Sequence, residues 1–113
     1  MADVLKSAVV PIGAGSTELL AAVAGGTSVI QMLQVGNVDG TSAATFDLSI
    51  NKNGSGDTNV MTTIPVPVGK AVVVYSDANG KLYLSDDGTA DTLDAVASVA
   101  GDLVATISYI ERT

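Results

Sequence analysis

The segment Ala44-Thr45-Phe46-Asp47-Leu48-Ser49-Ile50-Asn51 decides the fold, because apolar and polar residues alternate along it. Phe46, Leu48 and Ile50 share one face, and the polar residues between them lie on the other. Successive side chains of a strand point to opposite faces, so this period of two predicts a half-buried β-strand.

Three further runs have the character of strands. Val29–Val35 and Ala71–Tyr75 are rich in the β-branched residues that strands favour. Leu103–Ile110 also alternates, and it carries apolar residues on both faces. We therefore expect one face of this run to enter the core and a neighbour to cover the other.

Turn-forming residues separate these runs. Asn51–Asp57 is expected to be a flexible loop in which Asn-Gly adopts positive φ. Asp77–Gly80 separates two short apolar runs and predicts a tight hairpin. Pro65 and Pro67 donate no hydrogen bond to a neighbouring strand, so the segment around them is expected to be an edge strand or an extended connection.

Two segments, Glu18–Ala24 and Asp91–Ala100, fit both a helix and a strand. In the second segment, a helical stripe would consist of Leu93, Val96, Ala97 and Ala100, and a strand face of Leu93, Ala95, Ala97 and Val99. Periodicity leaves the two alternatives open.

The runs and turns together predict an all-β fold. Eight to nine short strands at a spacing of about ten residues are typical of an antiparallel β-sandwich, either jelly-roll or immunoglobulin-like. The 113 residues fit a single domain, with a short N-terminal arm over about residues 1–16. We expect no helix longer than two turns.

The charge of the chain argues against several classes of partner. Five Lys and Arg residues face twelve Asp and Glu residues, which gives a formal charge of −7. The sequence has no basic stripe, so we expect no binding to nucleic acid, and anionic membranes are disfavoured for the same reason. We also expect no membrane-spanning segment and no signal peptide, because no apolar run is long enough.

The sequence contains neither Cys nor His. A disulfide framework and a thiolate metal site are therefore excluded. Most catalytic triads and acid–base pairs depend on imidazole, so we expect that the protein is not an enzyme and uses no cofactor.

Two groups of polar residues were weighed as sites. Asp86, Asp87, Asp91 and Asp94 are spaced closely enough to offer oxygen ligands to a cation such as calcium, but they do not match an EF-hand loop. A solvated acidic turn explains them better, and we assign no metal site. Tyr75, Tyr83 and Tyr109 could form a platform for sugars, although core filling with hydroxyls at the rim is the simpler interpretation.

Six segments follow one another in a recognisable order along the chain: Thr17–Asn37, Ala44–Asn51, Ile64-Pro-Val-Pro-Val-Gly69, Gly80-Lys-Leu-Tyr-Leu-Ser85, Asp91-Thr-Leu93 and Ser98–Glu111. This order resembles that of the small β-sandwich structural proteins of tailed bacteriophage virions. The similar segments cover about residues 17 to 111, but Ala24-Gly25 lacks the usual Pro before it, and Ala90 replaces a usual Gly.

The resemblance implies a β-sandwich, a strand at Asp91–Val99 and no catalytic residues. It favours a capsid decoration (cement) protein that stabilises the outer shell of the virion as a homo-oligomer, with a trimer expected. Its partner would be the major capsid protein or another virion protein. The chain itself would be made in the host cytoplasm and would be located in the virion. The alternative is a tail, neck or fibre component, or a carbohydrate-binding β-sandwich module. The residues expected at the oligomer or capsid interface are Val104, Thr106, Ser108 and Ile110.

Overall fold

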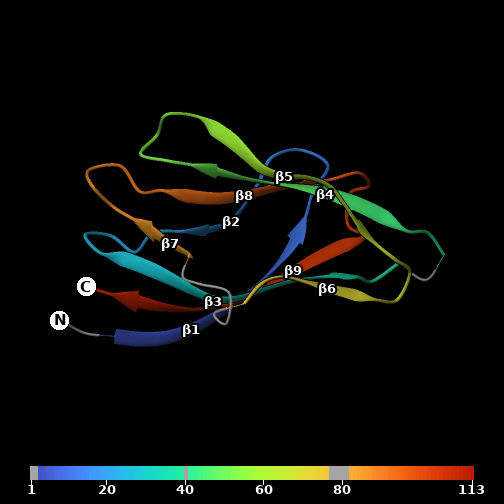
Figure 1. The fold of residues 1–113 in the computed structure, drawn as a ribbon, viewed down its shortest axis with the longest axis horizontal. Helices are drawn as coiled ribbons and strands as arrows, with labels where there is room; N and C mark the ends of the chain where they lie inside the picture. Colours follow the sequence, from blue (N-terminus) through green and yellow to red (C-terminus); the bar gives the residue numbers. More distant parts are fainter. Residues whose placement is uncertain (1–2, 40, 77–81) are drawn as a thin grey trace.

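The computed structural model describes residues 3–39, 41–76 and 82–113 of the chain. These residues form nine β-strands in two stacked sheets, with both termini at the same end of the molecule (Figure 1). The strands are β1 (Asp3–Ile12), β2 (Thr17–Ala21), β3 (Thr27–Asn37), β4 (Ala44–Asn51), β5 (Asp57–Val66), β6 (Ala71–Ser76), β7 (Leu82–Ser85), β8 (Thr92–Ala97) and β9 (Leu103–Arg112).

All pairs of neighbouring strands are antiparallel. Sheet A has the order β1-β9-β3-β6, with β7 also paired to β3, and sheet B has the order β2-β8-β4-β5. The pairs β1–β9, β2–β8, β3–β6 and β4–β5 are the four antiparallel pairs of a jelly roll, and the chain crosses repeatedly between the sheets. The predicted sandwich is therefore confirmed, and the jelly-roll alternative is the one adopted.

The core lies between the sheets and is built from their inner faces. Phe46 and Leu48 of β4 face the core, as their alternation predicts, together with Leu103, Ala105 and Ile107 of β9. Phe46 supplies the only phenyl ring of the chain, and most of the remaining core is aliphatic. A core of this kind depends on close aliphatic packing, since it gains little from aromatic pairs.

Both ambiguous segments form strands. Thr17–Ala21 is β2 and Thr92–Ala97 is β8, and the two pair with each other at the edge of sheet B. Leu93, Ala95 and Ala97 are buried, as the strand alternative requires, but β8 ends before Val99, which is 47% exposed. Tertiary pairing therefore decides a choice that local periodicity leaves open. In the described residues no helix is long and apolar enough to cross a membrane.

The turn predictions hold in part. The turn between β4 and β5 contains positive φ at Asn53 and Gly54, as Asn-Gly favours. The proline-containing segment is the end of β5, an edge strand of sheet B, as predicted. The predicted turn at Asp77–Gly80 lies outside the described residues. In the described part, however, its flanking strands do not pair as a hairpin, because β6 and β7 pair with different halves of β3.

The prediction of an N-terminal arm is wrong for most of its length. Residues 3–12 form β1, an edge strand of sheet A that pairs with β9 from Asp3↔Arg112 to Ile12↔Leu103. The segment lacks an alternating pattern because most of its residues are exposed on both faces. Its partner is about a hundred residues away in the sequence, so local inspection could not reveal the pairing.

Candidate functional site

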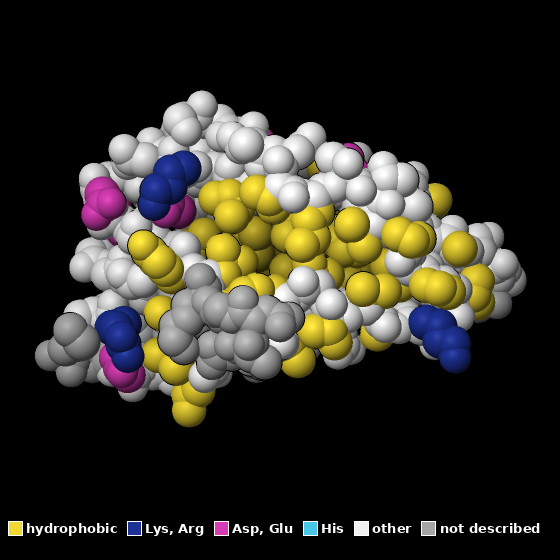
Figure 2. All heavy atoms as spheres, viewed as in Figure 1, with side chains coloured by type: hydrophobic (Ala, Val, Ile, Leu, Met, Phe, Trp, Pro, Cys, Tyr) yellow, Lys and Arg dark blue, Asp and Glu magenta, His cyan; other side chains and the backbone are white. Residues whose placement is uncertain are grey.

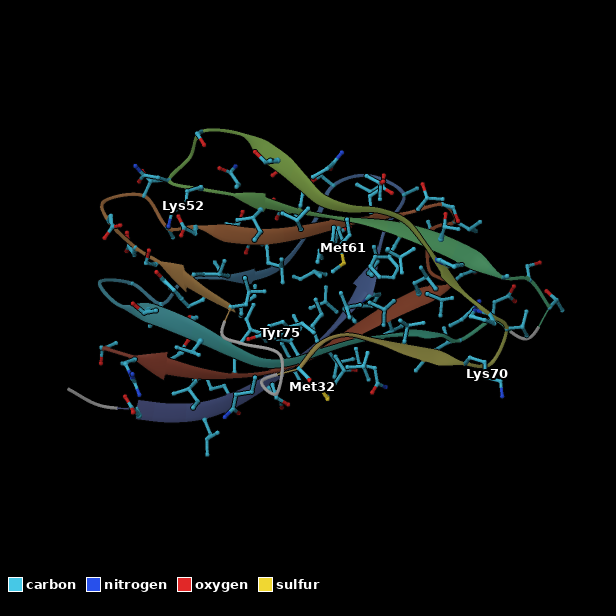
Figure 3. The ribbon with its side chains drawn as sticks, viewed as in Figure 1. Met32, Lys52, Met61, Lys70 and Tyr75 are labelled. Carbon is cyan, nitrogen blue, oxygen red and sulfur yellow. The ribbon has the colours of Figure 1, made fainter. Side chains whose placement is uncertain are left out.

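The four predicted interface residues lie on the outer face of sheet A. Val104, Thr106, Ser108 and Ile110 are half-buried, whereas the residues between them in β9 point into the core. Because β9 is a central strand flanked by β1 and β3, these side chains occupy the middle of the outer face. Figure 3 shows Met32 of β3 pointing away from sheet B on the same face.

The strand register extends this face across the sheet. Residues directly opposite each other on paired strands share a face, so four rows of side chains can be assigned. In the order β1, β9, β3 and then β7 or β6, the rows are Leu5, Ile110, Val29, Tyr83; Ser7, Ser108, Met32, Ser76; Val9, Thr106, Gln34, Val73; and Pro11, Val104, Gly36, Ala71. We call these residues the neutral face, because none of them is charged.

The neutral face exposes large apolar side chains. Leu5 is 73% exposed and Val9 is 67% exposed, and both lie on β1; Val73 and Tyr83 are also exposed. The ion pair between Asp3 Oδ2 and Arg112 Nη2, 3.1 Å apart, lies in the next row and marks one end of the face. Single exposed apolar residues are common, whereas large contiguous apolar patches mark sites of interaction.

The outer face of sheet B has the opposite character. Asp94 of β8 is paired with Glu18 of β2, and Asp47 of β4 is on the same face. Asp57, at the start of β5, lies close enough to Asp94 for a hydrogen bond when one of the two carboxyls is protonated. The molecule therefore carries a neutral outer face on sheet A and an acidic outer face on sheet B.

Asp94 is the most perturbed carboxyl on the acidic face. Its side chain points outward, yet the residue is only 7% exposed. Burial is the largest cause that raises its pKa to about 6, and the hydrogen bond and charge of Asp57 act in the same direction. Thr92 Oγ1, which donates to Asp94 Oδ2 at 3.2 Å, opposes the shift. Asp94 thus binds a proton more tightly than an ordinary aspartate does.

The four aspartates weighed as a cation site do not come together. Asp86 Oδ2 accepts a hydrogen bond from Gly25 N, and Asp87 is exposed. Asp91 is buried below the β4–β5 turn, whereas Asp94 lies on the outer face of sheet B. Across residues 3–39, 41–76 and 82–113, no three acidic side chains are grouped so that they could hold a metal ion.

Asp91 instead organises a structural network. Its Oδ2 lies 2.8 Å from Lys52 Nζ and accepts from Ser85 N at 3.1 Å, while its Oδ1 accepts from Asn53 N at 2.8 Å. Burial alone would raise the pKa of Asp91, but the hydrogen bonds from Lys52, Ser85 and Asn53 together lower it. The carboxylate thus ties the β4–β5 turn to the end of β7.

The three tyrosines predicted as a possible platform are separated. Tyr109 is in the core, and Tyr83 is exposed on the neutral face, which is the other side of sheet A. Tyr75 lines a cleft between the two sheets. The structure therefore brings together no aromatic surface of the kind that stacks on sugar rings.

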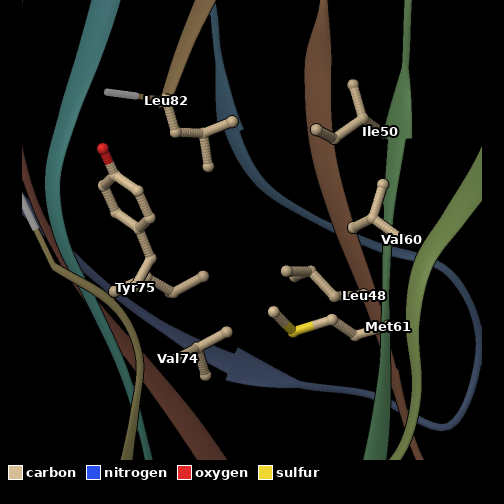
Figure 4. Close-up of a pocket in the computed structure, with 8 residues that line it drawn as sticks. Leu48, Ile50, Val60, Met61, Val74, Tyr75 and Leu82 are labelled. Carbon is tan, nitrogen blue, oxygen red and sulfur yellow. The ribbon is translucent and has the colours of Figure 1, made fainter. Parts of the chain in front are cut away.

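This cleft is a feature that the sequence did not predict. Figure 2 shows apolar side chains gathered in a hollow between the layers, and the close-up in Figure 4 shows that they come from both sheets. Its volume is about 300 Å³. The lining residues are Leu33, Leu48, Ile50, Val60, Met61, Val74, Tyr75 and Leu82, none of them charged.

Two β-bulges shape the cleft. Val60 is an extra residue in β5, between the pairs Leu48↔Met61 and Ser49↔Asn59. Val74 is an extra residue in β6. Bulges redirect side chains at sheet edges, and both of these extra valines line the cleft. A bulge depends on the register of two strands, so no local sequence signal identified this site.

Comparison with protein-family models, curated proteins and solved structures gives no match for this chain.

Proposed function

We propose that this chain is a structural protein of a bacteriophage virion, most directly a capsid decoration protein that stabilises the outer shell as a homo-oligomer. A trimer is expected, since icosahedral shells offer three-fold positions. The partner is the major capsid protein or another virion protein. The proposal assigns no catalytic residue and no cofactor.

The observation that carries this proposal is the neutral face. Four rows of paired side chains carry no charge, although the chain has a formal charge of −7. This uncharged face, with its exposed apolar side chains, favours a surface that is covered by another one. The acidic face of sheet B, in contrast, is suited to solvent and keeps the protein soluble. One covered face and one solvated face are what a subunit in the outermost layer of an assembly requires.

The jelly-roll fold is compatible with this role by analogy. Viral capsid proteins and lectins both use this strand order. A fold by itself does not define a function, so the choice between the two rests on the surface. The separated tyrosines do not favour sugar binding, and the neutral face favours assembly.

Imaging of purified particles tests the proposal. We expect density for the chain at repeated positions over the icosahedral lattice, and we expect particles without the chain to lose their contents at a lower temperature. Density confined to one vertex would favour a tail, neck or fibre component instead. Absence of the chain from the particles would contradict both structural roles.

A further inference from the structure

We propose that the neutral face of each chain packs against the neutral faces of other copies of this chain. The oligomer then has sheet A at its centre and the acidic face of sheet B on its outside. This inference rests on the proposed function, which requires that copies assemble but does not say through which surface. It also implies that the neutral face contacts sister subunits and that the shell binds elsewhere.

The distribution of charge selects a second copy as the occupant. Packing a neutral face on the acidic face of another copy would bury Glu18, Asp47 and Asp94 without a basic partner, at a large desolvation cost. Two neutral faces bury no charge. This arrangement also places the acidic faces at the greatest distance from one another, which minimises the repulsion between chains of formal charge −7.

The size of the face matches a stable interface. Strands of ten residues at about 3.3 Å per residue, in four positions about 4.8 Å apart, span roughly 600 Å² before side-chain relief is added. Stable interfaces bury about 800 Å² per partner. At about 3.3 Å per residue, a ten-residue strand covers about 33 Å of the molecule's 46 Å length, so most of this length would contribute to the contact.

The composition of the face also fits a contact between protein chains. Leu5, Val9 and Tyr83 project from it and can act as anchors. Between them lie small polar side chains such as Ser7 and Ser108, which can form hydrogen bonds at a wet interface and leave no charge to desolvate.

Sedimentation of matched variants tests the inference. Val9→Lys adds a charge to the neutral face at a position that is 67% exposed, and Val99→Lys makes the same change after the end of β8, at a position that is 47% exposed. We expect the wild-type chain and Val99→Lys to sediment at a small multiple of 11.3 kDa, and Val9→Lys at 11.3 kDa. A cooperative melting transition in each variant will show that both fold.

A labelling experiment tests the same surface without introducing a charge. The chain has no Cys, so Val9→Cys and Val99→Cys each create a single thiol. Val9 is the more exposed of the two positions in one chain. We nevertheless expect a maleimide to label Val9→Cys about tenfold more slowly than Val99→Cys at a concentration where roughly nine chains in ten are assembled. Dilution should remove the difference.

Two results would overturn the inference. One is a wild-type chain that sediments only as a monomer at high concentration. The other is an oligomer that Val9→Lys leaves intact, with equal labelling of the two thiols. A monomer that still covers the shell in particle images would refute this inference and the proposed homo-oligomer, and would leave the decoration role standing. An oligomer assembled through the neutral face but absent from particles would do the reverse.

Discussion

Replacing Asp94 by Asn should stabilise the protein at neutral pH and weaken the dependence of its stability on pH. In the wild type, ionisation leaves two adjacent carboxylates, Asp57 and Asp94, in a place that water reaches poorly. Asn removes one charge and keeps the shape, and its amide can donate to the Asp57 carboxylate. The substitution therefore mimics the protonated form of Asp94.

The magnitude follows from the pKa of Asp94, which is raised from 3.8 to about 6. A raised carboxyl pKa stabilises the folded state below the unfolded pKa, and this contribution is lost as the pH rises through about 6. A pKa raised this far corresponds to about 3 kcal/mol in full, of which about 1 kcal/mol is regained between pH 8 and pH 5.

Asp91 limits how far stability can rise as the pH falls. Its lowered pKa gives stability that is present above the unfolded value and is lost as the pH falls through the folded value. The two groups act in opposite directions, so their combined contribution to stability should be greatest between the ordinary aspartate pKa of 3.8 and the raised pKa of Asp94, about 6. At pH 5 the contribution of Asp91 is still intact.

Urea unfolding at pH 5 and pH 8 measures the effect. We expect the wild type to gain unfolding free energy on going to pH 5, and Asp94→Asn to gain about 1 kcal/mol less than the wild type does. Asp87→Asn, the same change at an exposed position in the turn before β8, is the matched control and should follow the wild type. If Asp94→Asn also follows the wild type, the assigned role of the Asp57–Asp94 pair is wrong.

Three further substitutions test the interior and the cleft. Asp91→Ala leaves the N–H groups of Asn53 and Ser85 without their acceptor, so it should lower the unfolding free energy by about 3 kcal/mol in urea titrations. A loss smaller than that of a surface variant would contradict the structural role of Asp91. Phe46→Ala should lower the unfolding free energy by about 4 kcal/mol in the same assay, because the ring is fully buried. A small loss would mean that the core is wrongly assigned. The native protein should bind anilinonaphthalene sulfonate in the cleft and enhance its fluorescence. Met61→Lys should abolish most of this fluorescence, and an unchanged signal would mean that the dye binds elsewhere.

The sequence predicted the elements that local patterns encode. Alternation at Phe46, Leu48 and Ile50 identified β4 with its correct bounds, because one face of that strand is buried and the other is solvated. The outward-facing residues of β9 were identified in the same way. Strand β1 was missed, since an exposed edge strand is under no pressure to alternate.

Features that depend on pairing between distant strands could not be predicted. The neutral face emerges only when the register aligns Val9 with Thr106 and Gln34. The cleft requires the bulges at Val60 and Val74, and the Asp57–Asp94 pair requires β5 and β8 to lie in one sheet. None of these contacts leaves a periodic trace along the chain.

We propose that this protein is an assembly subunit whose neutral face is covered and whose acidic face is solvated. A high-resolution map of particles that carry the chain tests it most directly. We expect copies at repeated positions over the shell, with Val9 and Thr106 buried in contacts between subunits and Glu18 and Asp47 facing solvent. A map in which the chain is present but its neutral face is open to solvent would contradict this account.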